Sequence, residues 1–149
     1  MTTATFPDRT VTARGWRATP ARAARAGGGS PERDGWAEQF RRLDSLRELQ
    51  DDWDGLEAKA PRAELVDSAL VLGWILRQQG VAAPCRVVPG VNGTVLLEWQ
   101  SEGAYCEIEV TEPYRGEVMQ ILPGQPAQHW VLTDEGSANA SSPEGNGAQ

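Results

Sequence analysis

The sequence predicts an α+β domain in which two helices pack on one face of an antiparallel meander of four or five strands. Three patterns support this fold class. Apolar residues recur every three or four positions from Trp36 to Leu49, and a second, more apolar segment follows Pro61. From Cys85 onward, apolar and polar residues alternate. The first two patterns are typical of helices and the third of half-buried strands, and helices that precede a run of strands indicate the α+β class.

The α+β domain is predicted to span residues 30–133, between two segments without hydrophobic periodicity. Residues 1–29 are rich in Arg, Thr and Ala and end in three glycines, so we expect a disordered Arg-rich arm. An arm of this composition also resembles an organelle transit peptide, or could dock on an anion such as the acidic body of the same chain. Residues 134–149 are mostly Gly, Ser, Asn and Ala, and we expect a disordered tail.

Both helices have recognisable ends in the sequence. The first is predicted to start at Ser30–Glu32, where a hydroxyl group, a proline and an acid favour a helix N-terminus, and to end by Gln50. The second is predicted from Pro61 to Gly80, a glycine in the position of a C-terminal cap. This helix is apolar nearly all round, so we expect it to be buried in the domain or to form a homodimer through residues 61–79.

The strands follow from the alternation that starts after the second helix. Four are predicted, joined by short turns, at residues 85–88, 94–99, 104–110 and 117–122, and residues 129–133 would add a fifth. In this meander Cys85 and Cys106 would lie two strands apart, roughly 10 Å at about 4.8 Å per strand. A disulfide requires Cα atoms within about 7 Å of each other. We therefore expect both thiols to be free.

Negative charge is concentrated in the predicted domain. The chain has a net charge of −7, but residues 1–33 carry +4, so the remaining residues carry −11. An acidic body argues against nucleic acid as a ligand, because phosphate binding requires a basic face. It favours a cationic partner, a metal ion or simple solubility. No apolar run approaches the roughly 20 residues that span a bilayer, so we expect a cytoplasmic protein with no membrane contact.

An acidic loop with one large aromatic residue separates the two predicted helices. Trp53 is flanked by Asp51, Asp52 and Asp54. We expect the indole to pack into the core between the helices and the sheet, while the aspartates form Asx-type turns and stay in water. Three neighbouring carboxylates could instead hold a divalent ion, although the spacing lacks the alternating oxygen ligands and the closing Glu of a calcium loop.

A second candidate site lies on the predicted sheet and comprises Glu98, Tyr105, Glu107 and Glu109. These residues fall out of phase with the apolar positions of their strands, so they should share the solvent-facing side. That side would be a solvated surface or a binding face for an Arg-rich partner. Paired carboxylates can also act as acid and base in hydrolysis. The sequence has no nucleophile elbow, zinc motif or phosphate loop and a single histidine, His129, so we expect no enzymatic activity and no cofactor or bound metal.

Three short motifs resemble those of a group of small bacterial proteins to which no activity is assigned. They are the acid-Trp-Asp-Gly loop at Asp52–Gly55, the apolar segment from Pro61 to Gly80, and the strand end Leu97–Trp99. The resemblance covers residues 43–110 and neither tail. It implies a bacterial cytosolic accessory protein, and it transfers no substrate and no catalytic residue.

The sequence thus favours a non-enzymatic, acidic protein-interaction domain. Its partner would be a protein with a basic surface, bound through the acidic loop and the acidic sheet face. A sharper version is a neutralising partner of the antitoxin or immunity type, which masks a basic surface by charge complementarity. The alternatives are a divalent-metal-binding protein or hydrolase that uses Asp51, Asp52 and Asp54, and a homo-oligomeric assembly or structural protein.

Overall fold

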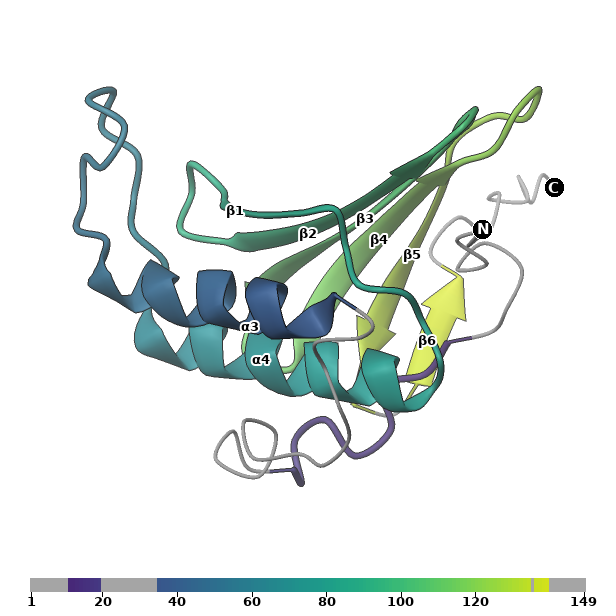
Figure 1. Cartoon of the computed structure of the whole chain (residues 1–149), viewed down its shortest axis with the longest axis horizontal. Helices are drawn as coiled ribbons and strands as arrows, with labels where there is room; N and C mark the ends of the chain where they lie inside the picture. Colours follow the sequence, from purple (N-terminus) through teal and green to yellow (C-terminus); the bar gives the residue numbers. More distant parts are fainter. Residues whose placement is uncertain (1–10, 20–34, 135, 140–149) are drawn as a thin grey trace, which may run out of the picture.

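The computed structural model describes residues 11–19, 35–134 and 136–139, which form two helices packed on an antiparallel sheet. The strand order follows the sequence, so each strand pairs with the one before it. The strands are β1 (Arg86–Pro89), β2 (Val95–Ser101), β3 (Ala104–Glu112), β4 (Arg115–Ile121), β5 (Gln128–Thr133) and β6 (Gly136–Asn139). Helices α3 (Trp36–Ser45) and α4 (Ala63–Gln78) lie side by side on one face of this sheet (Figure 1). The predicted α+β meander is confirmed.

β6 is the strand that the sequence did not predict. It pairs antiparallel with β5, from Thr133 opposite Gly136 to Trp130 opposite Asn139. Its residues, Gly-Ser-Ala-Asn, have low strand propensity and no apolar alternation. Pairing of the backbone with β5, and not the side-chain pattern, therefore defines this strand, and the segment assigned to the tail begins as part of the sheet.

The C-terminal ends of both helices lie close to the predicted positions, whereas α4 begins at Ala63, after the predicted start at Pro61. The predicted start at Ser30–Glu32 lies outside the described residues, and within them α3 begins at Trp36. A 3-10 turn, η2 (Leu46–Glu48), continues α3 almost to the predicted end. At the end of α4, Gly80 has φ 83° and its N–H bonds to the Arg77 carbonyl at 3.0 Å. This is the glycine cap that the sequence predicted, since a left-handed residue there costs glycine least.

α4 is largely buried by α3 and by the sheet, which accounts for its apolar character within one chain. It contacts β2 and β3 on one side and α3 on the other. α3 approaches closely because α4 has no side chain at Gly73: a Cβ there would lie 3.0 Å from Phe40 Cε1 and 3.1 Å from Trp36 Cζ3. The Trp36 ring is fully buried, stacks on Phe40 and donates its Nε1–H to the Val81 carbonyl at 3.0 Å.

Residues 11–19, which the sequence assigned to a disordered arm, pack against the core. Trp16 is fully buried and donates its Nε1–H to the Ser68 carbonyl of α4 at 2.8 Å. Its ring meets the Tyr114 ring edge-on, with centroids 6.3 Å apart. The backbone of Thr12 exchanges two hydrogen bonds with the Gln79 side chain, at 2.7 and 3.2 Å. Val11 and Ala13 are buried in the same core, so this segment joins it mainly through apolar contact, with Trp16 as its largest side chain.

Candidate functional site

The acidic loop, residues 51–60, protrudes between α3 and α4 and is held by its own aspartates (Figure 1). Asp51 accepts a hydrogen bond from the Ala60 N–H at 3.0 Å, and Asp52 accepts one from the Glu57 N–H at 2.8 Å. Such bonds satisfy backbone donors that have no partner in a helix or a strand. The carboxylates of these two residues therefore shape the loop while their side chains stay exposed to solvent.

Asp54 makes two further bonds of this kind. Its Oδ1 accepts the N–H of Leu56 at 2.8 Å and that of Ala58 at 3.0 Å. The bond from Leu56 is the main cause that lowers the pKa of Asp54 below its usual value, because it favours the charged carboxylate. The bond to Leu56, two positions on, is an Asx-type turn of the predicted kind, whereas Asp51 and Asp52 accept N–H groups nine and five positions away.

The prediction that Trp53 packs into the core is wrong. Trp53 is only partly buried and is not one of the aromatic residues that contact the core. Its indole instead folds over its own loop and donates Nε1–H to the Lys59 carbonyl at 3.1 Å. The fully buried indoles among the described residues are those of Trp36, from α3, and of Trp16, from the N-terminal segment.

The metal alternative gains no geometric support from the acidic loop. No group of three or more His, Cys, Asp and Glu side chains is placed to hold a metal ion anywhere in the described part of the chain. The oxygens of Asp51, Asp52 and Asp54 that accept backbone N–H bonds are directed at different parts of the loop. A hard cation requires such oxygens to converge on one point.

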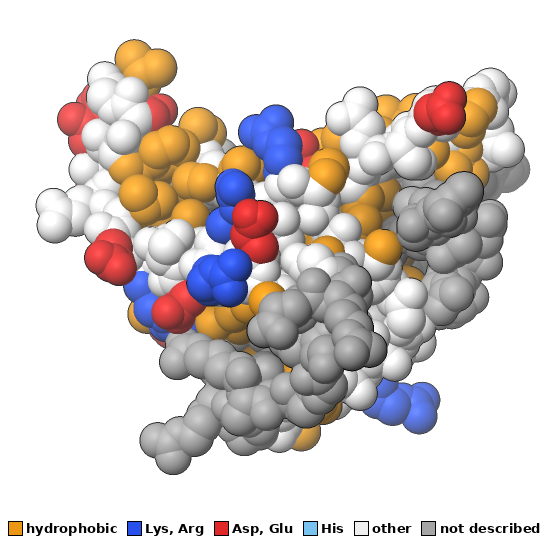
Figure 2. Space-filling view, in the orientation of Figure 1, with side chains coloured by type: hydrophobic (Ala, Val, Ile, Leu, Met, Phe, Trp, Pro, Cys, Tyr) orange, Lys and Arg blue, Asp and Glu red, His pale blue; other side chains and the backbone are white. Residues whose placement is uncertain are grey.

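The tip of the acidic loop is apolar. Leu56 is 82% exposed, and Val91, in the β1–β2 turn, is 59% exposed. The two turns are joined, because the Lys59 N–H bonds to the Val91 carbonyl at 2.9 Å. Hydrophobic side chains gather on this loop and below it in the space-filling view (Figure 2). The end of the molecule that the sequence expected to present charge also presents two large apolar side chains.

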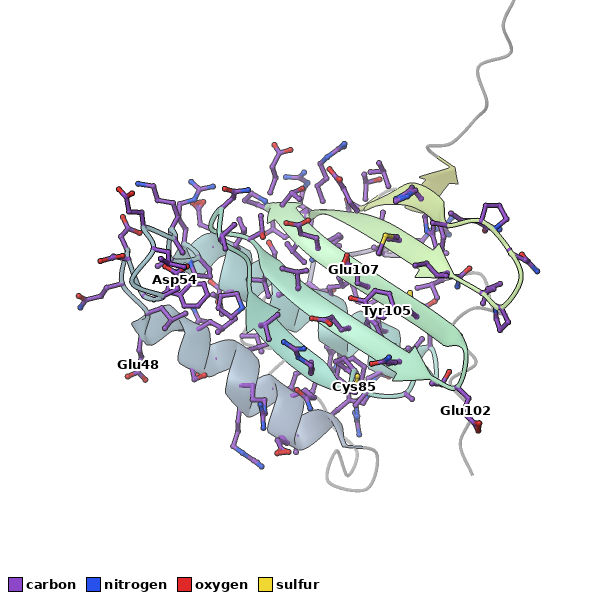
Figure 3. The ribbon with its side chains drawn as sticks, turned by 90° about the horizontal axis from the view of Figure 1, so that it is seen from above. Glu48, Asp54, Cys85, Glu102, Tyr105 and Glu107 are labelled. Atoms are coloured by element: carbon purple, nitrogen blue, oxygen red, sulfur yellow. The ribbon has the colours of Figure 1, made fainter. Side chains whose placement is uncertain are left out.

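The sheet has one face covered by the helices and one open face (Figure 3). Alternation within β3 puts Cys106, Ile108 and Val110 on the covered face, where each is at most 2% exposed. Tyr105 and Glu107 lie on the open face and remain partly exposed. This division of inward and outward residues is the one that the sequence predicted.

Glu98 and Glu107 face each other across strands β2 and β3. The Tyr105 hydroxyl lies 3.1 Å from Glu98 Oε1 and 3.1 Å from Glu107 Oε2, and its single proton can serve only one of them at a time. Burial, together with the charges of Glu107 and Glu98, raises the pKa of Tyr105, so the hydroxyl keeps its proton. Among the described residues, neither carboxylate has an ion-pair partner, although Arg86 lies opposite Glu98 on β1.

A second pair of carboxylates continues the acidic surface onto β4. Glu109 lies directly opposite Glu117, and Glu109 Oε2 accepts a hydrogen bond from the Thr94 hydroxyl at 2.7 Å. Glu117 is exposed, and the sequence analysis did not include it in the site. The alternation of β4 could have indicated that Glu117 faces outward, because it falls out of phase with the buried Val118. The register that pairs β4 with β3 places it beside Glu109.

The two predicted sites are separate. Asp54 lies at one end of the molecule, whereas Tyr105 and Glu107 lie in the middle of the open face (Figure 3). The structure thus brings together Glu98, Tyr105, Glu107 and Glu109, and it leaves Asp51, Asp52, Trp53 and Asp54 in the acidic loop. With Glu117 added, the residues on the sheet form the open acidic face, which consists of Glu98, Tyr105, Glu107, Glu109 and Glu117.

His129 is separated from both cysteines in the strand order of the sheet. Both cysteines are free, as predicted, with Cys85 exposed just before β1 and Cys106 buried on β3. His129 lies on β5, in the row that runs through Met119 to Glu107. It is therefore two strands from Glu107, roughly 10 Å away at about 4.8 Å per strand.

Neither helix is long and apolar enough to cross a membrane in the part of the chain that the structure describes.

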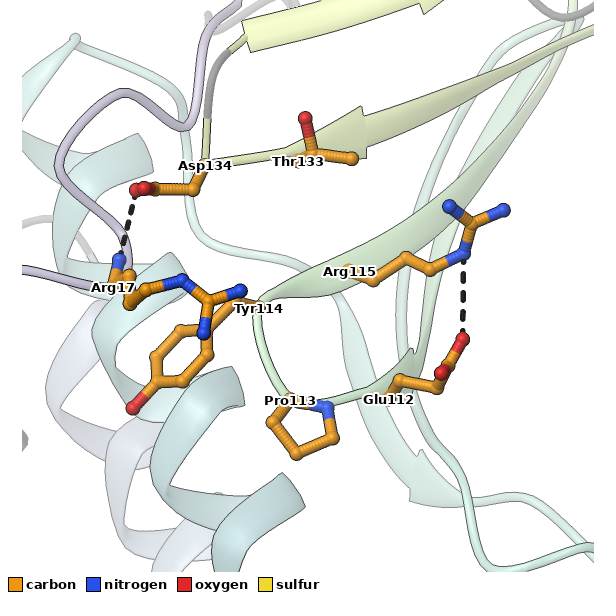
Figure 4. Close-up of a pocket in the computed structure, with 7 residues that line it drawn as sticks. All are labelled: Arg17, Glu112, Pro113, Tyr114, Arg115, Thr133 and Asp134. Carbon is orange, nitrogen blue, oxygen red and sulfur yellow. Dashed lines mark hydrogen bonds and ion pairs between the residues drawn. The ribbon is translucent and has the colours of Figure 1, made fainter.

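A pocket of about 490 Å³ lies where the N-terminal segment meets the β3–β4 turn and the end of β5 (Figure 4). No pattern in the sequence indicates it, because its walls come from three distant segments. Its lining residues are Arg17, Glu112, Pro113, Tyr114, Arg115, Thr133 and Asp134. Both charges are represented, with two arginines and two acids, so the pocket is polar and close to neutral.

The described residues define a class, an α+β domain with an open acidic face. Comparison with known proteins does not narrow that class, since no family model, no curated protein and no solved structure matches the chain. The resemblance of residues 43–110 to small bacterial proteins therefore stays a prediction. Within the described part of the chain, the open acidic face and the pocket are candidate binding surfaces.

Proposed function

We propose that this protein is a non-enzymatic interaction domain whose open acidic face binds a basic surface of another protein. The observation that supports this proposal most directly is the pairing of Glu98 with Glu107 and of Glu109 with Glu117 across neighbouring strands. Four carboxylates thus form one contiguous patch on a face that neither α3 nor α4 covers (Figure 3).

The free protein has an electrostatic reason to accept a cation there. Like charges directly opposite each other in a sheet are destabilising, by roughly 0.2–1 kcal/mol for each pair. One Tyr105 hydroxyl cannot neutralise Glu98 and Glu107. A guanidinium group from a partner can bond to both carboxylates at once, because its five N–H donors lie in one plane. Binding then replaces a repulsion with two charge-assisted hydrogen bonds.

A partner of this kind fits the neutralising role that the sequence suggested. Charge complementarity raises the association rate and selects against acidic partners. The body charge of −11 outside residues 1–33 would contribute to steering as well as the patch itself. The proposal therefore includes an antitoxin-like or immunity-like masking of a basic surface as its more specific form.

The test compares two variants that change net charge equally. Glu98→Gln/Glu107→Gln removes two charges from the open acidic face, and Glu48→Gln/Glu64→Gln removes two from the helices, where both glutamates are accessible to solvent. Each form, and the wild type, is used to capture partners from the native host at low and at high salt. We expect a basic protein that the wild type and the helix variant retain at low salt, and that the open-face variant loses.

Two results would contradict the proposal. Equal loss in both variants would show that net charge alone, and not the open acidic face, attracts the partner. Capture that does not change between low and high salt would show that the complex does not depend on screened charges. Binding of the purified partner, measured by calorimetry with all three forms, distinguishes a direct contact from co-purification.

A further inference from the structure

The pocket beside Tyr114 exists because the N-terminal segment docks on the domain. The Arg17 N–H bonds to Asp134 Oδ1 at 2.9 Å, which ties residues 11–19 to the end of β5 (Figure 4). The Arg17 guanidinium lies over the Tyr114 ring, 4.7 Å from its centroid. Arg17 and Asp134 are 117 positions apart in sequence, so the pocket is a product of tertiary structure.

Tyr114 is held in an unfavourable backbone conformation to form this wall. It has φ 61°, a left-handed conformation that glycine usually supplies at the second central position of a tight turn. A residue with a side chain is less stable there by about 1–2 kcal/mol. The buried Ser68 hydroxyl accepts the Tyr114 N–H at 3.2 Å and fixes the turn. In this conformation the Tyr114 ring contacts Trp16 in a T-shaped arrangement, and the Arg17 guanidinium lies over its face.

The hydrogen-bonding capacity of the pocket is unbalanced. Glu112 is paired with Arg115, with Oε1 and Nε 3.6 Å apart, and Asp134 accepts the Arg17 N–H. The Arg17 guanidinium, in contrast, has no carboxylate partner among the described residues. The guanidinium lies on the Tyr114 ring at the edge of a pocket that Arg115 also lines, and Arg17 is exposed to solvent (Figure 4). Among the charged groups that line the pocket, the planar guanidinium of Arg17 is therefore the one whose N–H donors have no partner of opposite charge within the described residues.

We propose that this pocket binds a small monocarboxylate, with its carboxylate on the Arg17 guanidinium and its apolar part against Pro113. A carboxylate matches the guanidinium in geometry, since both are planar and two parallel N–H···O bonds can form. A single negative charge fits better than two, because Glu112 and Asp134 repel a dianion such as phosphate. A volume of about 490 Å³ lies in the range of small-molecule sites.

The proposal is independent of the open acidic face, and its test uses a different readout. The full chain, labelled with ¹⁵N, is titrated with propionate, benzoate and inorganic phosphate at constant ionic strength, and amide shifts are followed by NMR. We expect saturable shifts at Arg17, Tyr114 and Thr133 with a monocarboxylate, at a Kd of about 1 mM or tighter. Phosphate should bind more weakly.

Variants of two neighbouring arginines provide the control. Arg17→Gln should weaken carboxylate binding about tenfold or more, because it removes the charged donor. Arg14→Gln makes the same charge change at another exposed position of the same segment, outside the pocket, and should leave binding unchanged. Arg17→Lys keeps the charge without the planar fork, and we expect an intermediate loss.

Three outcomes would overturn the proposal. They are the absence of saturable shifts at the pocket with either carboxylate, an equal loss of binding in Arg14→Gln and Arg17→Gln, and tighter binding of phosphate than of the carboxylates. The first removes the site, the second reduces it to bulk charge, and the third contradicts the assigned ligand chemistry. None of these outcomes bears on the open acidic face, so the two proposals fail separately.

Discussion

The covered and open faces of the sheet are built from alternate residues of the same strands, yet they have opposite effects on the stability of the fold. On β3, Ile108 is fully buried beneath the helices, while Glu107 beside it faces outward, opposite another carboxylate. The covered face supplies apolar burial, which is the dominant favourable term in folding. The open face carries charge repulsion that opposes folding. A sheet can hold such a face only because its other side supplies the stability.

The reactivities of the two thiols should differ more than any other property that distinguishes the covered face from exposed positions. Cys85 is exposed at the edge of the sheet, whereas Cys106 is 2% exposed on the covered face. Burial, with a smaller contribution from the charge of Glu107, raises the pKa of Cys106 to about 12. At pH 8 its thiolate fraction is then only about one in ten thousand, and the thiolate is the reactive form.

In a thiol-labelling assay at pH 8, we therefore expect one group to react in the folded protein and the second only on unfolding. Cys85→Ser identifies the fast group and should leave a folded protein that does not react quickly. Two fast thiols in the folded wild type would mean that the covered face is open to solvent, and the contrast between the faces would be lost.

Trp16 tests whether the N-terminal segment belongs to the covered side. Trp16→Ala removes a fully buried indole and its bond to the Ser68 carbonyl, so we expect a loss of about 3–5 kcal/mol in the free energy of unfolding. Trp53→Ala is the matched control, since that indole is partly exposed and bonds only within its own loop. It should cost about 1 kcal/mol. Urea denaturation measures the free energy of unfolding of both variants. Equal losses in the two would refute the assignment of Trp16 to the core.

A substitution at Glu98, on the open face, should change the free energy of unfolding least, and it should stabilise the protein instead of destabilising it. Glu98→Gln removes the repulsion with Glu107 and keeps an acceptor for Tyr105, so we expect the free protein to gain roughly 0.2–1 kcal/mol. The gain should shrink at high salt, because screening already weakens the repulsion. Glu48→Gln, on the helix side, should change stability less. A clear loss of stability in Glu98→Gln would mean that the glutamate pair is favourable without a partner.

The prediction of the fold succeeded where a local pattern carries the information. The alternation of β3 assigned the two faces correctly, including Tyr105 and Glu107 on the open one. In the acidic loop, Asp54 makes the short-range turn that Asx residues favour, by accepting the Leu56 N–H two positions on. Each of these features depends on residues within a few positions of one another, so the sequence displays them directly.

The prediction failed for the two indoles outside regular elements. Trp53 was assigned to the core because it lies between two predicted helices, and Trp16 was left out because its surroundings show no periodicity. The structure reverses them: Trp16 reaches Ser68, 52 positions away, whereas Trp53 bonds to Lys59 in its own loop. Which indole is buried depends on whether a cavity of the right shape lies within its reach, and no local pattern encodes that.

The sequence by itself determined the kind of each major element, the side of the sheet on which its residues lie, and the acidic character of the body. Only the tertiary structure decided that Trp16 reaches Ser68 across 52 positions, that Arg17 reaches Asp134 across 117 positions, and that a pocket forms beside Arg17 and Asp134. The physical reason is a difference in range. Helical and strand periods repeat every few residues, whereas these contacts close long loops, whose entropic cost depends only weakly on length. Such contacts are therefore selected by the shape and charge of surfaces that exist only after folding.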